Sequence, residues 1–132
     1  MTFVLPDTSI WARSHLGSVR PLLDAAIRGD RVVITGPIVL ELLRGARDWR
    51  DLEREARRYD ALPRVPDTLS LADRARSIQE ALSWRGYHRS PSAVDLLTAA
   101  AAEAVGAELW HCDRHFELIA EVTGQPVRQL GA

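Results

Sequence analysis

Short runs that favour β structure alternate along this chain with longer segments of helical spacing. Runs of apolar, β-branched or aromatic side chains lie at residues 2–6, 31–35 and 108–111. The second is β-branched through Val32, Val33 and Ile34, as fits a parallel strand covered on both faces. Because strands that alternate with helices form parallel sheets covered by helices, we predict one three-layer α/β/α domain over residues 1–132, with a mostly parallel central sheet.

The segments between these strands carry apolar residues three or four positions apart, which predicts amphipathic helices. Glycine or proline interrupts the pattern at most of their ends. Residues 63–66 are predicted as an extended link between two prolines, residues 87–91 as a loop and residues 126–130 as an edge strand. The predicted helices cover residues 8–16, 21–28, 38–46, 48–62, 67–84, 93–105 and 114–122.

The composition excludes several classes of protein. No apolar run is long enough to span a bilayer, and the first residues lack a basic region followed by a long apolar stretch, so we expect a cytoplasmic protein with no membrane association. The single cysteine, Cys112, has no partner for an internal disulfide, and its predicted role is that of a small residue closing a strand.

The charged residues argue against two further groups of functions. A formal net charge of −1 means that the protein does not bind nucleic acid through its overall charge, so any such binding must be local. All 17 basic residues are arginine. Walker-type nucleotide-binding loops, receiver domains and most aspartyl phosphatases use a lysine against phosphate, and this chain has none.

Four acidic residues occupy positions where an α/β fold brings strand ends and helix starts to one edge of the sheet. Asp7 follows the first predicted strand, Asp113 follows the strand at 108–111, and Glu41 and Asp95 lie in predicted helices. Two carboxylates about 4 Å apart repel by roughly 4 kcal/mol at an effective dielectric near 20, so converging acids require protons or a divalent cation. Oxygen-only ligands suit Mg²⁺ or Mn²⁺, and the pattern indicates a metal-dependent phosphodiester hydrolase.

Each acid also has a structural interpretation. Asp95 lies three residues after Ser92, the spacing of a capping box, and Asp7 and Asp113 are placed to cap the helices that follow them. Glu41 lies among apolar neighbours, where an unpaired glutamate is costly, and its structural alternative is an ion pair with Arg44 or Arg47.

Four segments together resemble the PIN-domain ribonucleases, and more narrowly the VapC toxins of bacterial type II toxin-antitoxin pairs. These are VLPDTSIW at 4–11, PIVLELLRG at 37–45, AVDLLTAAA at 93–101 and DRHF at 113–116. They occur in the family's order and cover nearly the whole chain. Pro6, in place of a plain apolar residue, and His111, in place of threonine, depart from the pattern. A lone histidine at a strand end is more often structural than a site residue.

The resemblance implies a PIN fold with four catalytic and Mg²⁺-binding acids, Asp7, Glu41, Asp95 and Asp113. We expect Asp7, Asp95 and Asp113 to hold Mg²⁺ (or Mn²⁺), while Glu41 completes the metal's shell or orients the attacking water. No covalent enzyme intermediate is expected.

The resemblance further implies Thr8 or Ser9 as a supporting hydroxyl near the metal, and Arg114, beside Asp113, is a candidate for binding RNA phosphate. It implies a homodimer and a cognate VapB-type antitoxin whose C-terminal segment carries an arginine aimed at the acids. The charged helix pair at 38–62 resembles the surface that grips this partner. Its six arginines between 44 and 58 alternate with acids at helical spacing, which favours pairing among themselves on a solvated face.

The functional hypothesis is therefore a metal-dependent endoribonuclease that hydrolyses RNA phosphodiester bonds as the toxin of a VapBC-type pair. Two alternatives stay open at the level of sequence. One is a PIN-domain RNA-processing nuclease without an antitoxin. The other is a catalytically silent binding module of the same fold, against which the complete set of acids argues.

Overall fold

The computed structural model describes residues 2–131, in which five short strands alternate with seven helices. The strands are β1 (Val4–Pro6), β2 (Ile34–Thr35), β3 (Arg64–Val65), β4 (Glu108–His111) and β5 (Val127–Gln129). The helices are α1 (Thr8–Ala12), α2 (Arg20–Arg28), α3 (Gly36–Leu43), α4 (Trp49–Asp60), α5 (Leu69–Ser83), α6 (Ala93–Val105) and α7 (His115–Thr123).

All strand pairs run parallel. One ladder has the order β1, β4, β5 and a second pairs β2 with β3. Val4 connects the two ladders: its N–H donates to the Arg31 carbonyl at 2.8 Å, and its carbonyl accepts from the Val33 N–H at 2.9 Å. The five strands therefore follow the order β3, β2, β1, β4, β5. The order reverses between β1 and β4, the point at which open parallel sheets place their ligand sites.

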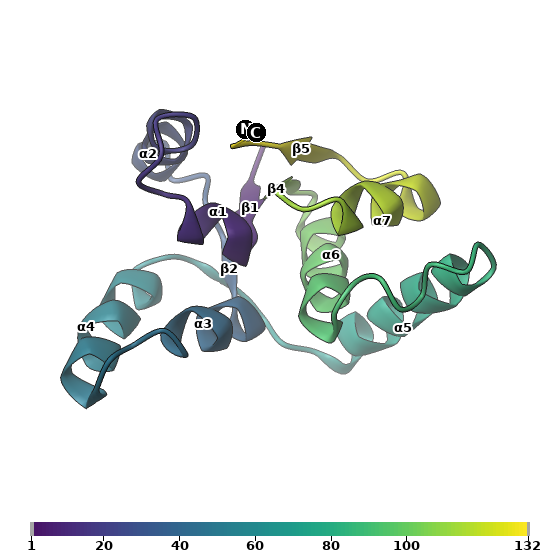
Figure 1. Cartoon of the computed structure of the whole chain (residues 1–132), viewed down its shortest axis with the longest axis horizontal. Coiled ribbons are helices and arrows are strands. Elements are labelled where there is room, and N and C mark those ends of the chain that lie inside the picture. Colours follow the sequence, from purple (N-terminus) through teal and green to yellow (C-terminus); the bar gives the residue numbers. More distant parts are fainter. Residues whose placement is uncertain (1, 132) are drawn as a thin grey trace.

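Figure 1 shows α1 and α2 on one side of the central strands and α6 and α7 on the other. The interior between them is filled by large side chains with almost no exposed surface, among them Leu5, Leu109 and Phe116. The predicted α/β fold with helices around a parallel sheet is confirmed. Within residues 2–131, no helix is long and apolar enough to cross a membrane.

Several predicted boundaries move for identifiable reasons. The helix predicted at 8–16 ends at Ala12, because Arg13 and Ser14 donate to carbonyls three residues earlier and the chain turns instead of continuing an α-helix. The predicted strand at 31–35 is regular only over its last two residues. The link predicted at 63–66 contains a real strand, β3, whose pairing was concealed by its two-residue length between prolines.

The unusual Pro6 is accommodated at the edge of the β1 and β4 pairing. The N–H of Asp7 donates to the Trp110 carbonyl at 2.9 Å, so the missing N–H of Pro6 falls on the opposite side of the strand. The Pro6 carbonyl accepts a hydrogen bond from Trp11 Nε1 at 3.2 Å. This bond attaches α1 to the end of β1.

Helix α6 matches its predicted range. Ser92 and Asp95 form the capping box at its start, and Gly106 ends it in the left-handed region at φ 66°. Its alanines from 99 to 102 are buried, and side chains this small let the helix pack closely against its neighbours. A bidentate ion pair between Arg74 and Glu103, at 2.6 and 2.9 Å, also joins α5 to α6.

We expect Ala100→Leu to lower the free energy of unfolding by about 1–3 kcal/mol, because a larger side chain has no room beside a fully buried alanine. Ala104 lies exposed on the same helix, so Ala104→Leu is the matched control and should change stability by less than about 0.5 kcal/mol. Urea unfolding followed by circular dichroism measures both. Equal stability of the two variants would contradict close packing of this helix.

Candidate active site

Asp7 lies at the junction of β1 and α1 and is buried, with 6% of its surface exposed. As the N-cap of α1 it accepts hydrogen bonds from the backbone N–H of Ser9, at 3.2 Å, and from the Ser9 hydroxyl. Both bonds end on Oδ1, and within residues 2–131 no hydrogen bond to Oδ2 is formed. Asp7 therefore caps α1 with one oxygen and makes no hydrogen bond with the other in this part of the chain.

Burial raises the pKa of Asp7 to about 6. Hydrogen bonds from Ser9 and Ile10 act in the opposite direction, and the negative charge of Asp95 adds to the increase. A nearby positive charge stabilises the ionised form of such a carboxyl group, because it offsets both the lost hydration and the repulsion from the neighbouring acid.

Asp95 comes to the same edge from the first turn of α6. Its Oδ2 accepts the Ser92 N–H at 3.0 Å, and its own N–H donates to the Ser92 hydroxyl at 3.1 Å, which completes the capping box. Burial raises the pKa of Asp95, and the charge of Asp113 raises it further, while hydrogen bonds from Ser92 and the charge of His115 lower it. The structural interpretation of Asp95 is thus confirmed, and the residue still lies within electrostatic reach of Asp7 and Asp113.

Asp113 follows β4 and begins the turn into α7. Its Oδ1 accepts the backbone N–H of His115 at 3.0 Å and lies 3.3 Å from His115 Nε2. Arg114 occupies the N-cap position and makes no capping bond with its side chain. Its side chain is exposed, and among residues 2–131 it takes part in no ion pair. Arg114 is therefore available to an anionic ligand beside Asp113.

Glu41 reaches the site from α3. Its Oε1 accepts the Thr8 hydroxyl at 2.6 Å, which joins α3 to the residue directly after Asp7. The ion pair with Arg44 or Arg47 offered as its structural alternative does not form in the described part of the chain, where Arg47 instead pairs with Asp51 at 3.5 Å. Thr8 thus positions Glu41.

The Ser9 hydroxyl joins the two strand ends that carry Asp7 and Asp113. It donates to Asp7 Oδ1 and accepts the Cys112 N–H at 3.0 Å, across 103 residues of sequence. Sequence reasoning named Thr8 and Ser9 as supporting hydroxyls, but it did not identify these partners. Their place directly after a strand-end aspartate was the available signal.

His111 has a structural role at the end of β4. It is fully buried, and its Nδ1 accepts the Asp113 N–H at 3.2 Å. Its Nε2 lies 3.0 Å from Glu117 Oε1, but the geometry does not make a hydrogen bond. Cys112 is partly buried, and burial raises the pKa of its thiol. Neither side chain joins the acids as a candidate ligand.

The donor set fits a hard divalent cation with a largely aqueous shell. Among residues 2–131, no three His, Cys, Asp or Glu side chains lie close enough together to enclose a metal ion by themselves. Mg²⁺ is commonly held by one or two carboxylates and several waters, and the carboxylates of Asp7 and Asp95 are ligands of this kind. Assignment of the metal to Asp7, Asp95 and Asp113 stays a prediction.

The sequence matches a known protein family and several of its members. The PIN domain family matches residues 4–122. Ribonuclease VapC21 of Mycobacterium tuberculosis is 40% identical over 134 residues, which cover 99% of this chain and 96% of the relative. Ribonuclease VapC18 of the same organism is 34% identical over 126 residues, covering 94% and 92%.

Solved structures show the same fold at lower identity. VapBC2 from Rickettsia felis, bound to a DNA fragment from its promoter, matches with a TM-score of 0.79 at 15% identity over 98% of this chain and 100% of that one. DNA-bound VapBC from Salmonella typhimurium matches with a TM-score of 0.75 at 18% identity over 98% of both chains. From the family match and the identity to its mycobacterial relatives, this chain belongs to the PIN domain family and, within it, to the VapC group.

Proposed function

We propose that this protein is a metal-dependent endoribonuclease that hydrolyses RNA phosphodiester bonds as the toxin of a VapBC-type pair. The observation that carries the proposal is the buried Asp7 at the end of β1, which lies within electrostatic reach of Asp95, itself within reach of Asp113 after β4. Its support from relatives is the identity of 34–40% to proteins named ribonuclease VapC, over nearly the whole chain.

The proposed metal is Mg²⁺ or Mn²⁺, held by Asp7 and Asp95 with Asp113 completing or orienting its shell. When bound, such an ion neutralises charge on a phosphodiester and lowers the pKa of a coordinated water. Support comes from the raised pKa values of Asp7 and Asp95, which both reflect burial and the charge of a neighbouring acid.

The chain's own residues have distinct proposed roles. Glu41, fixed by the Thr8 hydroxyl, presents its second carboxylate oxygen to orient or deprotonate the attacking water. Ser9 keeps the Asp7 side chain and the turn before Asp113 in register. Arg114 binds a substrate phosphate, because its guanidinium is exposed beside the acids and forms charge-assisted pairs with phosphate oxygens.

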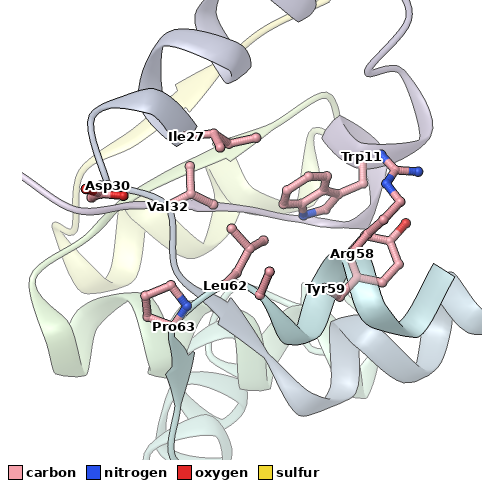
Figure 2. A pocket seen from close by; sticks show the side chains of 9 residues that line it. Trp11, Ile27, Asp30, Val32, Arg58, Tyr59, Leu62 and Pro63 are labelled. Atoms are coloured by element: carbon pink, nitrogen blue, oxygen red, sulfur yellow. The ribbon is translucent and has the colours of Figure 1, made fainter. Parts of the chain in front are cut away.

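A VapB-type antitoxin is the proposed protein partner. A mostly apolar pocket of about 270 Å³ lies between α1, the end of α2 and the end of α4. In Figure 2 the Trp11 indole faces Ile27, Val32 and Leu62 across this pocket, with Arg58 at its rim. The pocket includes the end of the helix pair predicted to grip the partner, and it provides apolar surface for side chains of an inserted segment.

A homodimer is also proposed. The large apolar side chains of Leu40 in α3 and Leu69 at the start of α5 are 69% and 79% exposed. We propose that a second copy of the chain covers these side chains, since a symmetric dimer uses the same surface of both subunits.

We expect purified protein to cut a total RNA pool into discrete fragments with Mg²⁺ or Mn²⁺, and to leave it intact with EDTA. Asp7→Asn should lower the cleavage rate by about 10²-fold or more, because the substitution removes a charged ligand while keeping the acceptor for Ser9. Gel analysis or sequencing of the RNA ends measures both effects.

The matched control for this cleavage assay is Asp73→Asn, an exposed acid on α5 away from the strand ends. Its cleavage rate should equal that of the wild type. Intact RNA under every condition, from folded and partner-free protein, would favour the silent binding module. Cleavage that persists in EDTA would contradict the metal requirement.

Metal-free Asp7→Asn should be more stable than the wild type near pH 7, by about 1–3 kcal/mol. Burial raises the pKa of Asp7 from its ordinary value of 3.8 to about 6 in the folded protein, so the folded state favours the protonated carboxyl. The stability that comes from this protonation is present in full below pH 4 and is lost as the pH rises through 6. The difference between variant and wild type should therefore open between about pH 4 and pH 6.

Thermal unfolding in EDTA from pH 4 to pH 8 measures this difference. Added Mg²⁺ should stabilise the wild type at neutral pH and not the variant. The difference in stability between the two proteins should then become smaller. A variant less stable than the wild type at every pH without metal would contradict an unfavourable buried charge at Asp7.

A further inference from the structure

A second pocket lies beside the acids, between the loop that joins α5 to α6 and the first turn of α7. Its volume is about 360 Å³. Five side chains line it: Tyr87, Ser90, Arg114, His115 and Leu118. The lining therefore combines an aromatic ring, hydroxyls, a guanidinium and an imidazole, and it contains no carboxylate.

The pocket is bounded by the two segments that carry Asp95 and Asp113. The loop with Tyr87 and Ser90 runs directly into Ser92, which caps α6 and holds Asp95. Arg114 and His115 follow Asp113, and the His115 ring lies 3.3 Å from Asp113 Oδ1. A molecule in this pocket therefore lies next to the His115 ring that contacts Asp113.

The loop is anchored where the aromatic residue leaves α5. Gly86 adopts the left-handed region at φ 76°, where other residues are strained, and the Tyr87 N–H donates to the Leu82 carbonyl at 3.0 Å. The Ser90 N–H donates back to the Tyr87 carbonyl at 3.2 Å. These bonds hold the backbone on both sides of the Tyr87 ring, which leaves 43% of that residue's surface exposed.

The chemistry of this lining suits one unpaired nucleotide. An exposed tyrosine ring stacks on any base, and arginine binds phosphate in a two-pronged geometry. The faces of unpaired bases in single-stranded loops and ends are accessible to an aromatic side chain, whereas bases inside an RNA duplex are stacked on one another. The absence of a carboxylate from the lining favours an anionic ligand over a cationic one.

We propose that this pocket, here called the Tyr87 pocket, binds a nucleotide of single-stranded RNA next to the scissile phosphate, with its base on Tyr87 and its phosphate on Arg114. The inference rests on the proposed ribonuclease function and adds a subsite to it. It assigns recognition of an unpaired base to the α5–α6 loop and places this recognition on the Asp113 side of the acids.

Photo-crosslinking tests the subsite without requiring cleavage. The probe is a pool of short single-stranded RNA of random sequence that contains 5-iodouridine, bound to full-length Asp7→Asn protein in EDTA. A stacked iodouracil couples to an aromatic side chain on irradiation, and peptide mass spectrometry locates the bond. We expect the main crosslink at Tyr87. Crosslinks only at other residues, from protein that does bind the pool, would overturn the subsite.

Substitutions provide the second arm, in otherwise wild-type protein with Mg²⁺. Tyr87→Ala should raise KM for a single-stranded substrate about tenfold, since the substitution removes the ring on which a base stacks. Tyr87→Phe retains the ring and should behave as wild type. Arg114→Ala should weaken binding and reduce its salt dependence, and Arg114→Lys should restore part of both.

The outcomes separate this subsite from the ribonuclease function itself. Metal-dependent cleavage with equal KM for wild type, Tyr87→Ala and Tyr87→Phe would overturn the Tyr87 pocket and leave the ribonuclease in place. Failure of the wild-type protein to bind or cleave RNA under any condition would overturn both. A rise in KM for Tyr87→Ala but not for Tyr87→Phe supports the subsite. Both variants lack the tyrosine hydroxyl and only Tyr87→Phe keeps the ring, so this result assigns the effect to the ring.

Discussion

The candidate site depends on the parallel pairing of β1 with β4. This pairing places the residues after both strands at one edge, at the point where the strand order of the sheet reverses. The Ser9 hydroxyl then links the two ends, because it donates to Asp7 and accepts from the N–H of Cys112. Asp7 and the turn that carries Asp113 are therefore positioned by one short network, and α6 and α3 supply Asp95 and Glu41 from either side.

The same arrangement is electrostatically unfavourable without a cation. Burial and the neighbouring charge raise the pKa of Asp7 to about 6, and burial with the Asp113 charge raises that of Asp95. Elsewhere the chain pairs its acids with arginine, as between Arg74 and Glu103. No arginine takes that place at Asp7 in the described structure, where its hydrogen bonds come from Ser9 and the α1 backbone. A protein that keeps these carboxylates together lowers its own stability at neutral pH, which is understandable if they bind a metal.

Much of this fold could be predicted because its signals are local. Helix α6 and strand β4 match their predicted ranges, since the capping box at Ser92 and the left-handed Gly106 mark the helix ends in the sequence itself. The early end of α1 and the pairing of β3 could not be predicted in this way. The early end of α1 comes from bonds to carbonyls three residues earlier, which no cap or breaker residue at that point announces. The pairing of β3 depends on β2, which is distant in sequence, and the two residues of β3 carry no period of their own.

The candidate site likewise contains residues that could be predicted from the sequence and contacts that could not. The positions of Asp7 and Asp113 follow from their places after strands, so sequence reasoning reached them. The bonds from Thr8 to Glu41 and from Cys112 to Ser9 span 33 and 103 residues and appear only when the helices and strands are assembled. The pocket beside Tyr87 could not be predicted from the sequence either, because its lining comes from a loop and a helix start that no motif connects.

The central claim is that these acids form a metal centre, and anomalous X-ray scattering from crystals soaked in Mn²⁺ tests it most directly. We expect an anomalous peak within coordination distance of Asp7 and Asp95 that is absent from crystals of Asp7→Asn. Well-diffracting wild-type crystals with Mn²⁺ bound only at other sites, or with no peak at these acids at saturating Mn²⁺, would contradict it.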